Sequence, residues 1–329
     1  MIISRTPFRI SFFGGGTDFP IWYKNNPSKV INVTINKYCY VNVRKLPPFF
    51  KYKFRLRYHK TEEVKLIDKI QHPTVRESLK FLKYNDRFEM IHNADLPAQS
   101  GLGASSSFSV GLLNCLHALN NKYISKKNLA NHAIFVEQNL VKDYVGSQDQ
   151  VAASFGGFNI IDFYGNDYKV KQIPLSYKNV KKLQESLLLV FSGFSRSASN
   201  VEKKKFKKLS KNISYFNEMN KISHAAENII YSSKNIISDF AELLNKQWYY
   251  KKKLTESVTN PAIDNLIKLG LKNGAEGAKI LGAGNGGFIL FLTDQKNISK
   301  LKEKFSDKLC LGVNFDSTGS QIIYFSENE

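Results

Sequence analysis

The sequence predicts an α+β protein built from two domains. Two kinds of hydrophobic pattern indicate this class. Several short segments alternate apolar and polar residues, which is the two-residue period of a half-buried strand. Other segments carry leucine at the three- and four-residue spacing of an amphipathic helix. The chain has 329 residues, of which 42% are hydrophobic, and this is enough for two domains of ordinary size.

Strands come first along the chain, and helices follow. Residues 31–35 and 41–43 alternate and predict one long strand, while 54–58 and 88–93 predict two more. A glycine-rich turn then leads into two helices. Their apolar positions are Leu112, Leu113, Leu116 and Leu119 in the first helix, and Leu129, Ala133, Val136 and Leu140 in the second.

The middle of the chain contains a predicted hairpin and the domain boundary. Residues 158–164 and 168–173 flank the pair Gly165-Asn166, which favours a tight turn. The apolar strand 187–191 follows after Pro174 and a lysine-rich stretch. We therefore predict an N-terminal domain over 1–180 and a C-terminal domain over 181–329.

The predicted C-terminal domain mixes helices and strands in the order expected of an α+β sandwich. Asn260 followed by Pro261 is a typical helix start, and Gly274 a typical stop. The predicted elements are helical sequence over 200–258, the helix from Asn260, a strand over 278–281, a glycine loop over 282–287, a strand over 288–292, a helix from Ile298 and two final strands.

The formal net charge of +20 comes from 48 basic and 28 acidic residues. A basic protein attracts nucleic acid, anionic membranes or phosphorylated metabolites. The chain is also rich in Asn, Ile and Phe, so we attribute most of the charge to compositional bias. Lysine runs such as Lys251 to Lys253 are then expected to be solvated helix faces. The three cysteines, far apart, and the lack of any apolar stretch of about 18 residues indicate a cytoplasmic protein without a membrane span.

The most informative motif is PAQSGLGASSS, residues 97–107, which follows a predicted strand and opens a helix. Glycines let the backbone approach a phosphate closely, and the free N–H groups of a helix N-terminus attract anions. A serine-capped helix after a glycine turn is the structural alternative. A Walker loop requires Lys after its last glycine, where this chain has Ala104, and a dinucleotide fingerprint requires a different glycine spacing.

Two further motifs make this loop part of a family pattern. Residues 6–18 read TPFRISFFGGGTD, and residues 279–288 read KILGAGNGGF. The three motifs together resemble those of the GHMP kinases, the family of galactokinase, homoserine kinase, mevalonate kinase and phosphomevalonate kinase. The resemblance implies an N-terminal domain like domain 2 of ribosomal protein S5 and a ferredoxin-like α/β sandwich as C-terminal domain. It also implies ATP and Mg²⁺ as cofactors, a phosphorylated alcohol as product, and a monomer or homodimer.

A narrower resemblance concerns the acceptor. Residues 13–20 (FGGGTDFP), 34–38 (TINKY) and 192–199 (SGFSRSAS) resemble the D-glycero-D-manno-heptose 7-phosphate kinases. These enzymes phosphorylate the anomeric hydroxyl on the way to GDP-heptose and surface polysaccharides. Galactokinases carry Glu-His where this chain has Gly15-Gly16, which argues against galactose. Fucokinase-like enzymes share part of the Gly-Gly-Gly-Thr-Asp pattern, so a free sugar remains an alternative acceptor.

The resemblance assigns the ATP and metal contacts. Gly101, Gly103, Ser105 and Ser106 match the positions that hold ATP phosphates, and Ser105 with Glu137 match the Mg²⁺ ligands. Carboxylate and hydroxyl oxygens suit a hard divalent cation. Ala104 replaces the usual serine just before Ser105, so one phosphate contact is expected to be missing or replaced. Taken alone, Glu137 would be expected to be a solvated helix charge.

The resemblance also assigns the catalytic and acceptor residues. Asp149 matches the carboxylate that accepts or orients the reacting hydroxyl, and Arg9 matches the basic residue that supports it. The structural alternatives are a helix cap for Asp149 and a paired arginine for Arg9. The residues expected at the acceptor are Gly14, Gly15, Gly16, Thr17, Asp18, Arg196 and Gly284. We predict that Arg196 binds the phosphate of a sugar phosphate, with Lys37 and Arg44 as further candidates.

Two other classes of function compete with the kinase. A catalytically silent sensor of sugar and ATP would lack the base, the metal ligand or the arginine, and all three positions are filled here. A nucleic-acid-binding protein would use the positive charge, but the sequence has no RNA-recognition signature. We therefore expect a sugar phosphate and ATP as partners, and no nucleic acid or membrane.

Overall fold

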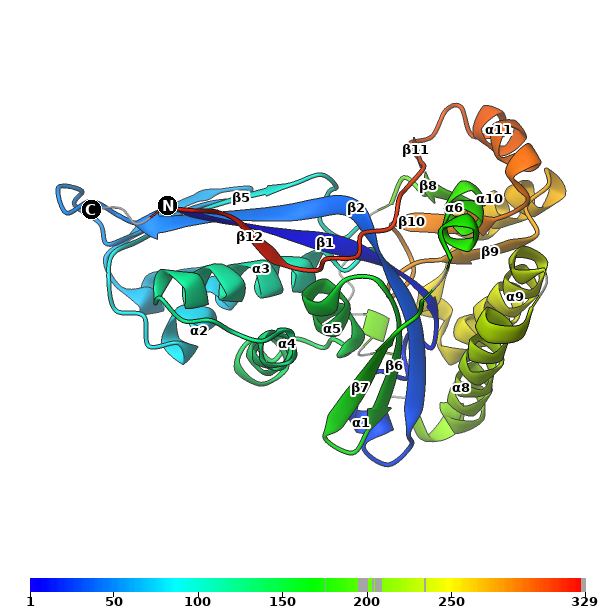
Figure 1. Cartoon of the computed structure of the whole chain (residues 1–329), viewed down its shortest axis with the longest axis horizontal. Helices are drawn as coiled ribbons and strands as arrows, with labels where there is room; N and C mark the ends of the chain where they lie inside the picture. The colour runs from blue at the N-terminus through cyan, green and yellow to red at the C-terminus, as the bar shows by residue number, and fades with distance from the viewer. Residues whose placement is uncertain (175, 195–200, 203, 205–208, 234, 327–329) are drawn as a thin grey trace.

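The computed structural model describes residues 1–174, 176–194, 201–202, 204, 209–233 and 235–326. Two β-sheets with helices packed on them form an elongated molecule (Figure 1). The larger sheet has eight strands and the smaller sheet has four among the described residues. This architecture is the α+β class predicted from the hydrophobic patterns.

The larger sheet is built around one long strand, as the alternation over 31–43 predicted. Strand β2 (Ser28–Lys45) pairs with β1 (Ile2–Phe13) over its residues 31–43. Its opposite edge serves two partners, since residues 39–45 pair with β5 and residues 28–33 pair with β6. The remaining strands are β3 (Phe54–Arg57), β4 (Thr61–Val64), β5 (Phe88–Ala94), β6 (Phe158–Tyr164), β7 (Asp167–Gln172) and β12 (Gln321–Phe325).

Helices cover one face of the larger sheet. The central helix is α3 (Ala104–Leu119), which contacts β1 and β2, while the other helices of this layer pack around it (Figure 1). The predicted hairpin is confirmed as β6 and β7, and the first predicted helix as α3. The second predicted helix, with apolar positions from Leu129 to Leu140, is α4 followed directly by the π-helical turn η2. The other helical elements of this region are α1 (Pro20–Tyr23), η1 (Ile67–Lys69), α2 (Pro73–Phe81), α4 (Lys126–Phe135), the π-helical turn η2 (Val136–Leu140) and α5 (Gln148–Phe155).

The smaller sheet lies in the C-terminal half and has the strand order β11-β8-β10-β9. The N-cap predicted at Asn260 is confirmed, because its side chain accepts a hydrogen bond from Ile263 N. The strands are β8 (Leu187–Phe191), β9 (Gly277–Ile280), β10 (Phe288–Leu292) and β11 (Cys310–Leu311). The helices are α6 (Tyr177–Glu185), α8 (Leu209–Ser232), α9 (Ile236–Leu254), η3 (Glu256–Val258), α10 (Pro261–Lys272) and α11 (Gln295–Lys304).

The last strand leaves the smaller sheet. Strand β12 pairs antiparallel with β1 at the edge of the larger sheet, where it is drawn in red beside the blue strand (Figure 1). The chain thus returns to its first sheet after building the second one. The predicted division at residues 180 and 181 follows the order of the sequence, whereas residues 321–325 belong to the first sheet in space.

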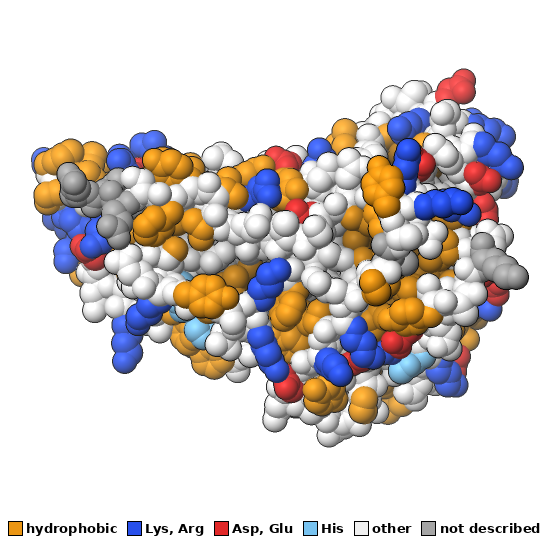
Figure 2. Space-filling model, viewed as in Figure 1, with side chains coloured by type: hydrophobic (Ala, Val, Ile, Leu, Met, Phe, Trp, Pro, Cys, Tyr) orange, Lys and Arg blue, Asp and Glu red, His pale blue; other side chains and the backbone are white. Residues whose placement is uncertain are grey.

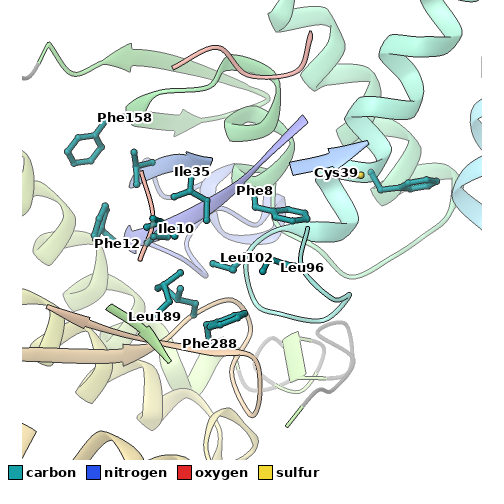
Figure 3. Close-up of a cluster of buried hydrophobic side chains, with 14 of the residues drawn as sticks. Phe8, Ile10, Phe12, Ile35, Cys39, Leu96, Leu102, Phe158, Leu189 and Phe288 are labelled. Carbon is teal, nitrogen blue, oxygen red and sulfur yellow. The ribbon is translucent and has the colours of Figure 1, made fainter. Parts of the chain in front are cut away.

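One hydrophobic core joins the two sheets. Phe8 and Phe12 of β1 belong to the same buried cluster as Leu189 of β8 and Phe288 of β10, and all four side chains are almost completely buried (Figure 3). Burial of such side chains contributes roughly 1.5–3 kcal/mol each. Since this contact lies beside the glycine-rich loops, it fixes how the two halves of the molecule enclose the space between them.

The surface shows no single basic patch on the face drawn in Figure 2. Lysine and arginine side chains are scattered over it and alternate with acidic and apolar groups. This distribution agrees with compositional bias as the source of the charge of +20. Within the described part of the chain, no helix is both long and apolar enough to span a bilayer.

Candidate active site

A cavity of about 310 Å³ lies between the two halves of the molecule. Four segments surround it: the loop after β1, the glycine loop before α3, residues 143–149, and the glycine loop after β9. Helix α9, in the C-terminal half, adds the side chain of Lys251. All three sequence motifs therefore meet at one place, although more than 170 residues separate the second from the third in the sequence.

The second motif forms one wall of this cavity. Gly101 and Gly103 have φ values of 81° and 79°, a left-handed conformation that favours glycine. Gly103 is the N-cap of α3, and no side chain caps this helix N-terminus. The structural alternative of a serine-capped helix is therefore wrong. The first N–H groups of a sixteen-residue helix are available to an anion in the cavity.

Arg9 and Asp149 form a two-pronged ion pair at the centre of the site. Arg9 Nε donates to Asp149 Oδ1, and Arg9 Nη2 donates to Asp149 Oδ2, both at 2.7 Å. Arg9 Nη1 also donates to Gly101 O at 2.8 Å, which ties the pair to the phosphate loop. Asp149 does not cap α5, since Ser147 is the N-cap residue and Asp149 lies inside the first turn of the helix. It keeps 25% of its side chain exposed to the cavity.

Glu137 is buried behind the phosphate loop, so the expectation of a solvated charge is wrong. It lies on the π-helical turn η2, where Val141 N donates to Val136 O, and such turns often occur at functional sites. Its Oε2 accepts from Ser106 Oγ at 3.0 Å and from Gln150 Nε2 at 2.6 Å. Burial raises the pKa of Glu137 to about 7, although the hydrogen bonds from Gln150 and Ser106 lower it.

These groups fit a divalent cation. Glu137 Oε1 is buried and has no hydrogen bond in the described part of the chain, so it has a lone pair to offer. A cation would also balance the charge of a carboxylate that burial disfavours. Both serines line the cavity, but Ser105 is exposed, whereas Ser106 is buried and donates its hydroxyl to Glu137. The two serines predicted to hold phosphates thus occupy different environments.

The loop after β1 places Asp18 in the cavity lining, next to the start of α5. Asp18 Oδ1 accepts from Gly16 N at 2.8 Å, and its Oδ2 accepts from Gln148 N at 3.2 Å. Burial, together with the charge of Asp149, raises the pKa of Asp18 to about 6. Gly15, Gly16 and Asp18 line the cavity as predicted for the acceptor site.

Gly14 and Thr17 shape this loop from behind. The Thr17 hydroxyl donates to Gly14 O at 2.8 Å, and the side chain of Thr17 is buried. A Cβ on Gly14 would lie 2.0 Å from Lys29 O, so only glycine allows the loop to pack against β2 at this position. These two residues therefore support the loop from behind and are not among the cavity-lining residues.

The third motif packs against the second. A Cβ on Gly282 would lie 2.7 Å from Gly101 Cα, and one on Gly287 would lie 2.3 Å from Ser100 O. Gly282 and Ala283 line the cavity. Gly284, predicted to contact the acceptor, instead packs on Val258, where a Cβ would lie 2.4 Å from the carbonyl oxygen. Position 284 therefore requires glycine because a side chain there would collide with the backbone of Val258.

The sequence analysis missed several residues of the cavity lining, among them two lysines and a glutamine. Lys279 and Lys251 line the cavity with 3% and 4% exposure, and Gln148 lines it from the first turn of α5. Lys251 belongs to a run that was expected to be a solvated helix face, and for this lysine the expectation is wrong. Its partner in the run, Lys253, is exposed. Only the position of Lys279 at the start of the third motif offered a signal in the sequence.

Arg196 lies outside the described residues, so its predicted contact with phosphate stays a prediction. The two further candidates are placed elsewhere. Arg44 is bound to Glu89 at 2.5 Å on the far part of the larger sheet, and neither Arg44 nor Lys37 lines the cavity.

The N-terminus of α3, the carboxylates of Asp18 and Asp149, and the guanidinium of Arg9 surround one cavity. Together with the fold, this arrangement is that of a phosphotransferase. Residues 71–157 match the family model for the GHMP kinases N terminal domain, and residues 232–309 match that for the GHMP kinases C terminal. The protein belongs to the GHMP kinase family. It is a sugar kinase that transfers phosphate to an alcohol group, and ATP is the phosphate donor of this family.

Three relatives illustrate the likeness. The D-glycero-alpha-D-manno-heptose 7-phosphate kinase of Campylobacter jejuni is 30% identical over 89% of this chain and 89% of its own length. The bifunctional fucokinase/GDP-fucose pyrophosphorylase of Arabidopsis thaliana is 23% identical over 90% of this chain, which spans 30% of that protein. The crystal structure of a D-glycero-D-manno-heptose 1-phosphate kinase from Bacteroides thetaiotaomicron superimposes with a TM-score of 0.81 at 20% identity, covering 99% of this chain and 100% of its own.

Proposed function

We propose that this sugar kinase phosphorylates the anomeric hydroxyl of D-glycero-D-manno-heptose 7-phosphate, which gives the 1,7-bisphosphate used to make GDP-heptose and surface polysaccharide. The observation that carries the proposal is the acceptor loop at the cavity. Its Gly15, Gly16 and Asp18 belong to the segment that resembles the heptose phosphate kinases, and the heptose 7-phosphate kinase of Campylobacter jejuni matches almost the whole chain.

Asp149 is the proposed proton acceptor. Each of its oxygens accepts one hydrogen bond from Arg9, which leaves further lone pairs for the sugar hydroxyl. As the hydroxyl oxygen attacks the γ-phosphorus of ATP, the bond from that phosphorus to the β-phosphate oxygen breaks, and the hydroxyl proton passes to Asp149. Arg9 holds this carboxylate in a fixed orientation through its two hydrogen bonds.

The glycine loop is proposed to hold the phosphates of ATP. Gly101 and Gly103 let the backbone approach them, while the N-terminus of α3 and the hydroxyls of Ser105 and Ser106 offer hydrogen-bond donors. Little covalent chemistry is required of the protein, because positioning and charge stabilisation carry most of phosphoryl transfer.

We propose Ser105 and Glu137 as the residues that hold Mg²⁺. When bound, this ion neutralises charge that develops on the β- and γ-phosphate oxygens. Ser106 donates to Glu137 and so orients the carboxylate from the side of the loop. Asp18, fixed by two backbone N–H groups, is proposed to accept hydrogen bonds from sugar hydroxyls next to the reacting one.

The proposed substrate also indicates the cellular location and the binding partners of the enzyme. We propose a cytoplasmic monomer or homodimer that binds a sugar phosphate and ATP, with no nucleic acid or membrane as a partner. The contact between Arg9 and Asp149, together with a buried Glu137 beside the loop, favours an active kinase over a silent sensor.

The test is ADP release with Mg²⁺ and a panel of acceptors. The panel contains D-glycero-D-manno-heptose 7-phosphate, the same heptose without phosphate, fucose, galactose, mannose and mevalonate. The proposal expects turnover with the heptose phosphate and little with the others. Efficient turnover with fucose instead would support the alternative of a fucokinase-like enzyme, which the match to the Arabidopsis protein keeps open.

A further inference from the structure

Three buried polar atoms in the cavity lining have no hydrogen-bond partner within the described part of the chain. They are Ser11 Oγ, Ser100 Oγ and Gln148 Oε1. Ser11 is 5% exposed and Gln148 is 7% exposed, so their polar atoms have little contact with bulk water. A buried polar atom without a partner destabilises a folded protein, which is why most such atoms are paired. A ligand in the cavity would supply the missing partners.

Ser11 and Gln148 reach the same point beside the acceptor loop. Ser11 lies in β1, and Gln148 is the first residue of α5, directly before Asp149. A Cβ on Gly15 would lie 3.2 Å from Ser11 Oγ and 3.3 Å from Gln148 Nε2. Because Gly15 has no side chain and lines the cavity, this point is open to a ligand.

The backbone of both residues is held in place by other groups. Ser11 pairs with Asn32 of β2, and its carbonyl oxygen accepts from Lys279 Nζ at 3.1 Å. Gln148 N donates to Asp18 Oδ2 at 3.2 Å. The two side chains are therefore positioned before a ligand arrives, and binding does not have to order the segments that carry them.

The chemistry of these two side chains fits a hydroxyl group better than a phosphate. The unpaired atom of Gln148 is an amide oxygen, which needs a hydrogen-bond donor. Ionised phosphate oxygens only accept hydrogen bonds, whereas a sugar hydroxyl both donates and accepts, as the hydroxyl of Ser11 does. Ser100 differs, because its hydroxyl can donate to a phosphate and it directly precedes Gly101 of the phosphate loop.

We propose that Ser11 and Gln148 together bind one non-reacting hydroxyl of the sugar acceptor and so determine which acceptors the enzyme accepts. This inference rests on the proposed function in one respect, that the acceptor is a sugar bound between the acceptor loop and Asp149. A site whose buried polar groups are paired only by a substrate hydroxyl rejects analogues that lack this hydroxyl, because those analogues leave the groups unpaired.

The first part of the test measures affinity. Calorimetry gives the Kd of D-glycero-D-manno-heptose 7-phosphate and of ATP for the full-length protein and for Ser11→Ala and Gln148→Met. Each variant is expected to bind the heptose phosphate about tenfold more weakly, the effect of one lost hydrogen bond, and to keep its affinity for ATP.

The chain offers a matched control for each variant. Ser154 of α5 and Gln247 of α9 are buried and also have side-chain atoms that no group in the described residues pairs, but neither residue lines the cavity. Ser154→Ala and Gln247→Met are therefore expected to leave both affinities unchanged.

The second part uses heptose 7-phosphates that lack the hydroxyl on C2, C3 or C4. The wild-type protein is expected to bind one of these analogues about tenfold more weakly than the complete sugar. Ser11→Ala and Gln148→Met are expected to bind that analogue as the wild type does, because the hydroxyl that they would contact is already absent. This non-additivity identifies the hydroxyl that the two side chains share.

Three results would overturn the proposal. One is a full additional loss in both variants with every deoxy analogue, which would mean that the side chains contact none of these hydroxyls. Another is an equal loss for ATP and for the heptose phosphate, which would assign the two residues to the nucleotide. The third is weaker binding of all ligands together with a lower Tm, as expected if the two side chains only support the fold.

The same design separates this inference from the proposed function. If the wild-type protein turns over fucose or another sugar in place of the heptose phosphate, the proposed acceptor is wrong, and the comparison is made with that sugar and its deoxy forms. Non-additive losses then support the roles of Ser11 and Gln148, whereas additive losses overturn them. Turnover of mevalonate alone, which is not a sugar, would overturn both proposals.

Discussion

Two ion clusters of similar burial form on strands of the larger sheet, one in the cavity and one away from it. In the cavity, Arg9 of β1 holds Asp149 of α5. Away from the cavity, Lys29 of β2 binds Asp162 of β6 and Glu227 of α8. The side chain of Arg9 is 5% exposed and that of Lys29 is 4% exposed, and both acidic partners in β6 and α5 keep 25% exposure.

The difference lies in what surrounds each cluster. The carboxylate of Asp149 is exposed to a cavity lined by glycine loops and by the open N-terminus of α3. The Lys29 cluster is closed instead by a second cation, since Lys171 of β7 binds both Asp162 and Glu227. Burial and charge therefore do not distinguish the Arg9–Asp149 pair from the Lys29 cluster. What distinguishes them is that the carboxylate of Asp149 is exposed to a cavity.

The largest effect is expected for Asp149→Asn. The amide cannot take the hydroxyl proton, so kcat should fall by about 10²–10⁴-fold, the usual contribution of a general base. Steady-state kinetics with saturating ATP measure this loss. Asp143→Asn is the matched control, since Asp143 also lines the cavity but accepts a hydrogen bond from Tyr144 N in its own turn. Asp149→Asn with wild-type kcat would show that this carboxylate only binds Arg9.

Lys29→Met should affect stability instead of activity. The change leaves Asp162 and Glu227 with Lys171 as their remaining partner in this cluster, and breaking a buried ion pair costs about 3–5 kcal/mol of the free energy of unfolding. Urea unfolding at pH 7 measures the loss, and KM for ATP should not change. Lys171→Met removes a more exposed charge from the same cluster and should cost less than about 1 kcal/mol. Equal losses in the two variants would contradict the assignment of Lys29.

The carboxyl group of Asp18 should make stability depend on pH. Its folded pKa of about 6 lies above the ordinary value of 3.8, so the folded state binds the proton more tightly than the unfolded state. The stability that this proton contributes is complete below about pH 4 and is lost as pH rises through 6. The loss is at most about 3 kcal/mol. In Asp18→Asn this part of the pH dependence should disappear, and identical slopes in the two proteins between pH 4 and 7.5 would contradict it.

The smallest effect separates the two serines at the start of α3. Ser105 is exposed in the cavity, whereas Ser106 donates its hydroxyl to Glu137. Ser105→Ala should raise the Mg²⁺ concentration for half-maximal rate by about tenfold, and Ser106→Ala should raise it less. Titration of Mg²⁺ at saturating substrates measures both. A larger shift for Ser106→Ala would assign the metal ligand to Ser106.

Much of the fold was predictable from local patterns. The alternation along β2, the hairpin of β6 and β7, and the Asn260 N-cap depend on neighbouring residues, and the structure confirms each of them. The pairing of β12 with β1 was not predicted. It joins strands separated by more than 300 residues, and no periodicity in either segment encodes such a partner.

The site was predictable where a family motif carried it. Arg9, Asp149 and Asp18 lie at the cavity as the motifs predicted. Lys251 was misread because a lysine run resembles a solvated face, and only the packing of α9 on β9 buries one member of the run. Gly284 lies in a matching motif but serves packing, a distinction that the sequence alone does not contain.

The most direct test of the account is ³¹P NMR of the wild-type protein with ATP, Mg²⁺ and D-glycero-D-manno-heptose 7-phosphate. The account predicts one new resonance coupled to the anomeric proton, equal in amount to the ADP formed, and its absence in Asp149→Asn on the same timescale. ADP accompanied by inorganic phosphate alone, or a new phosphate on another carbon of the sugar, would contradict the proposed reaction.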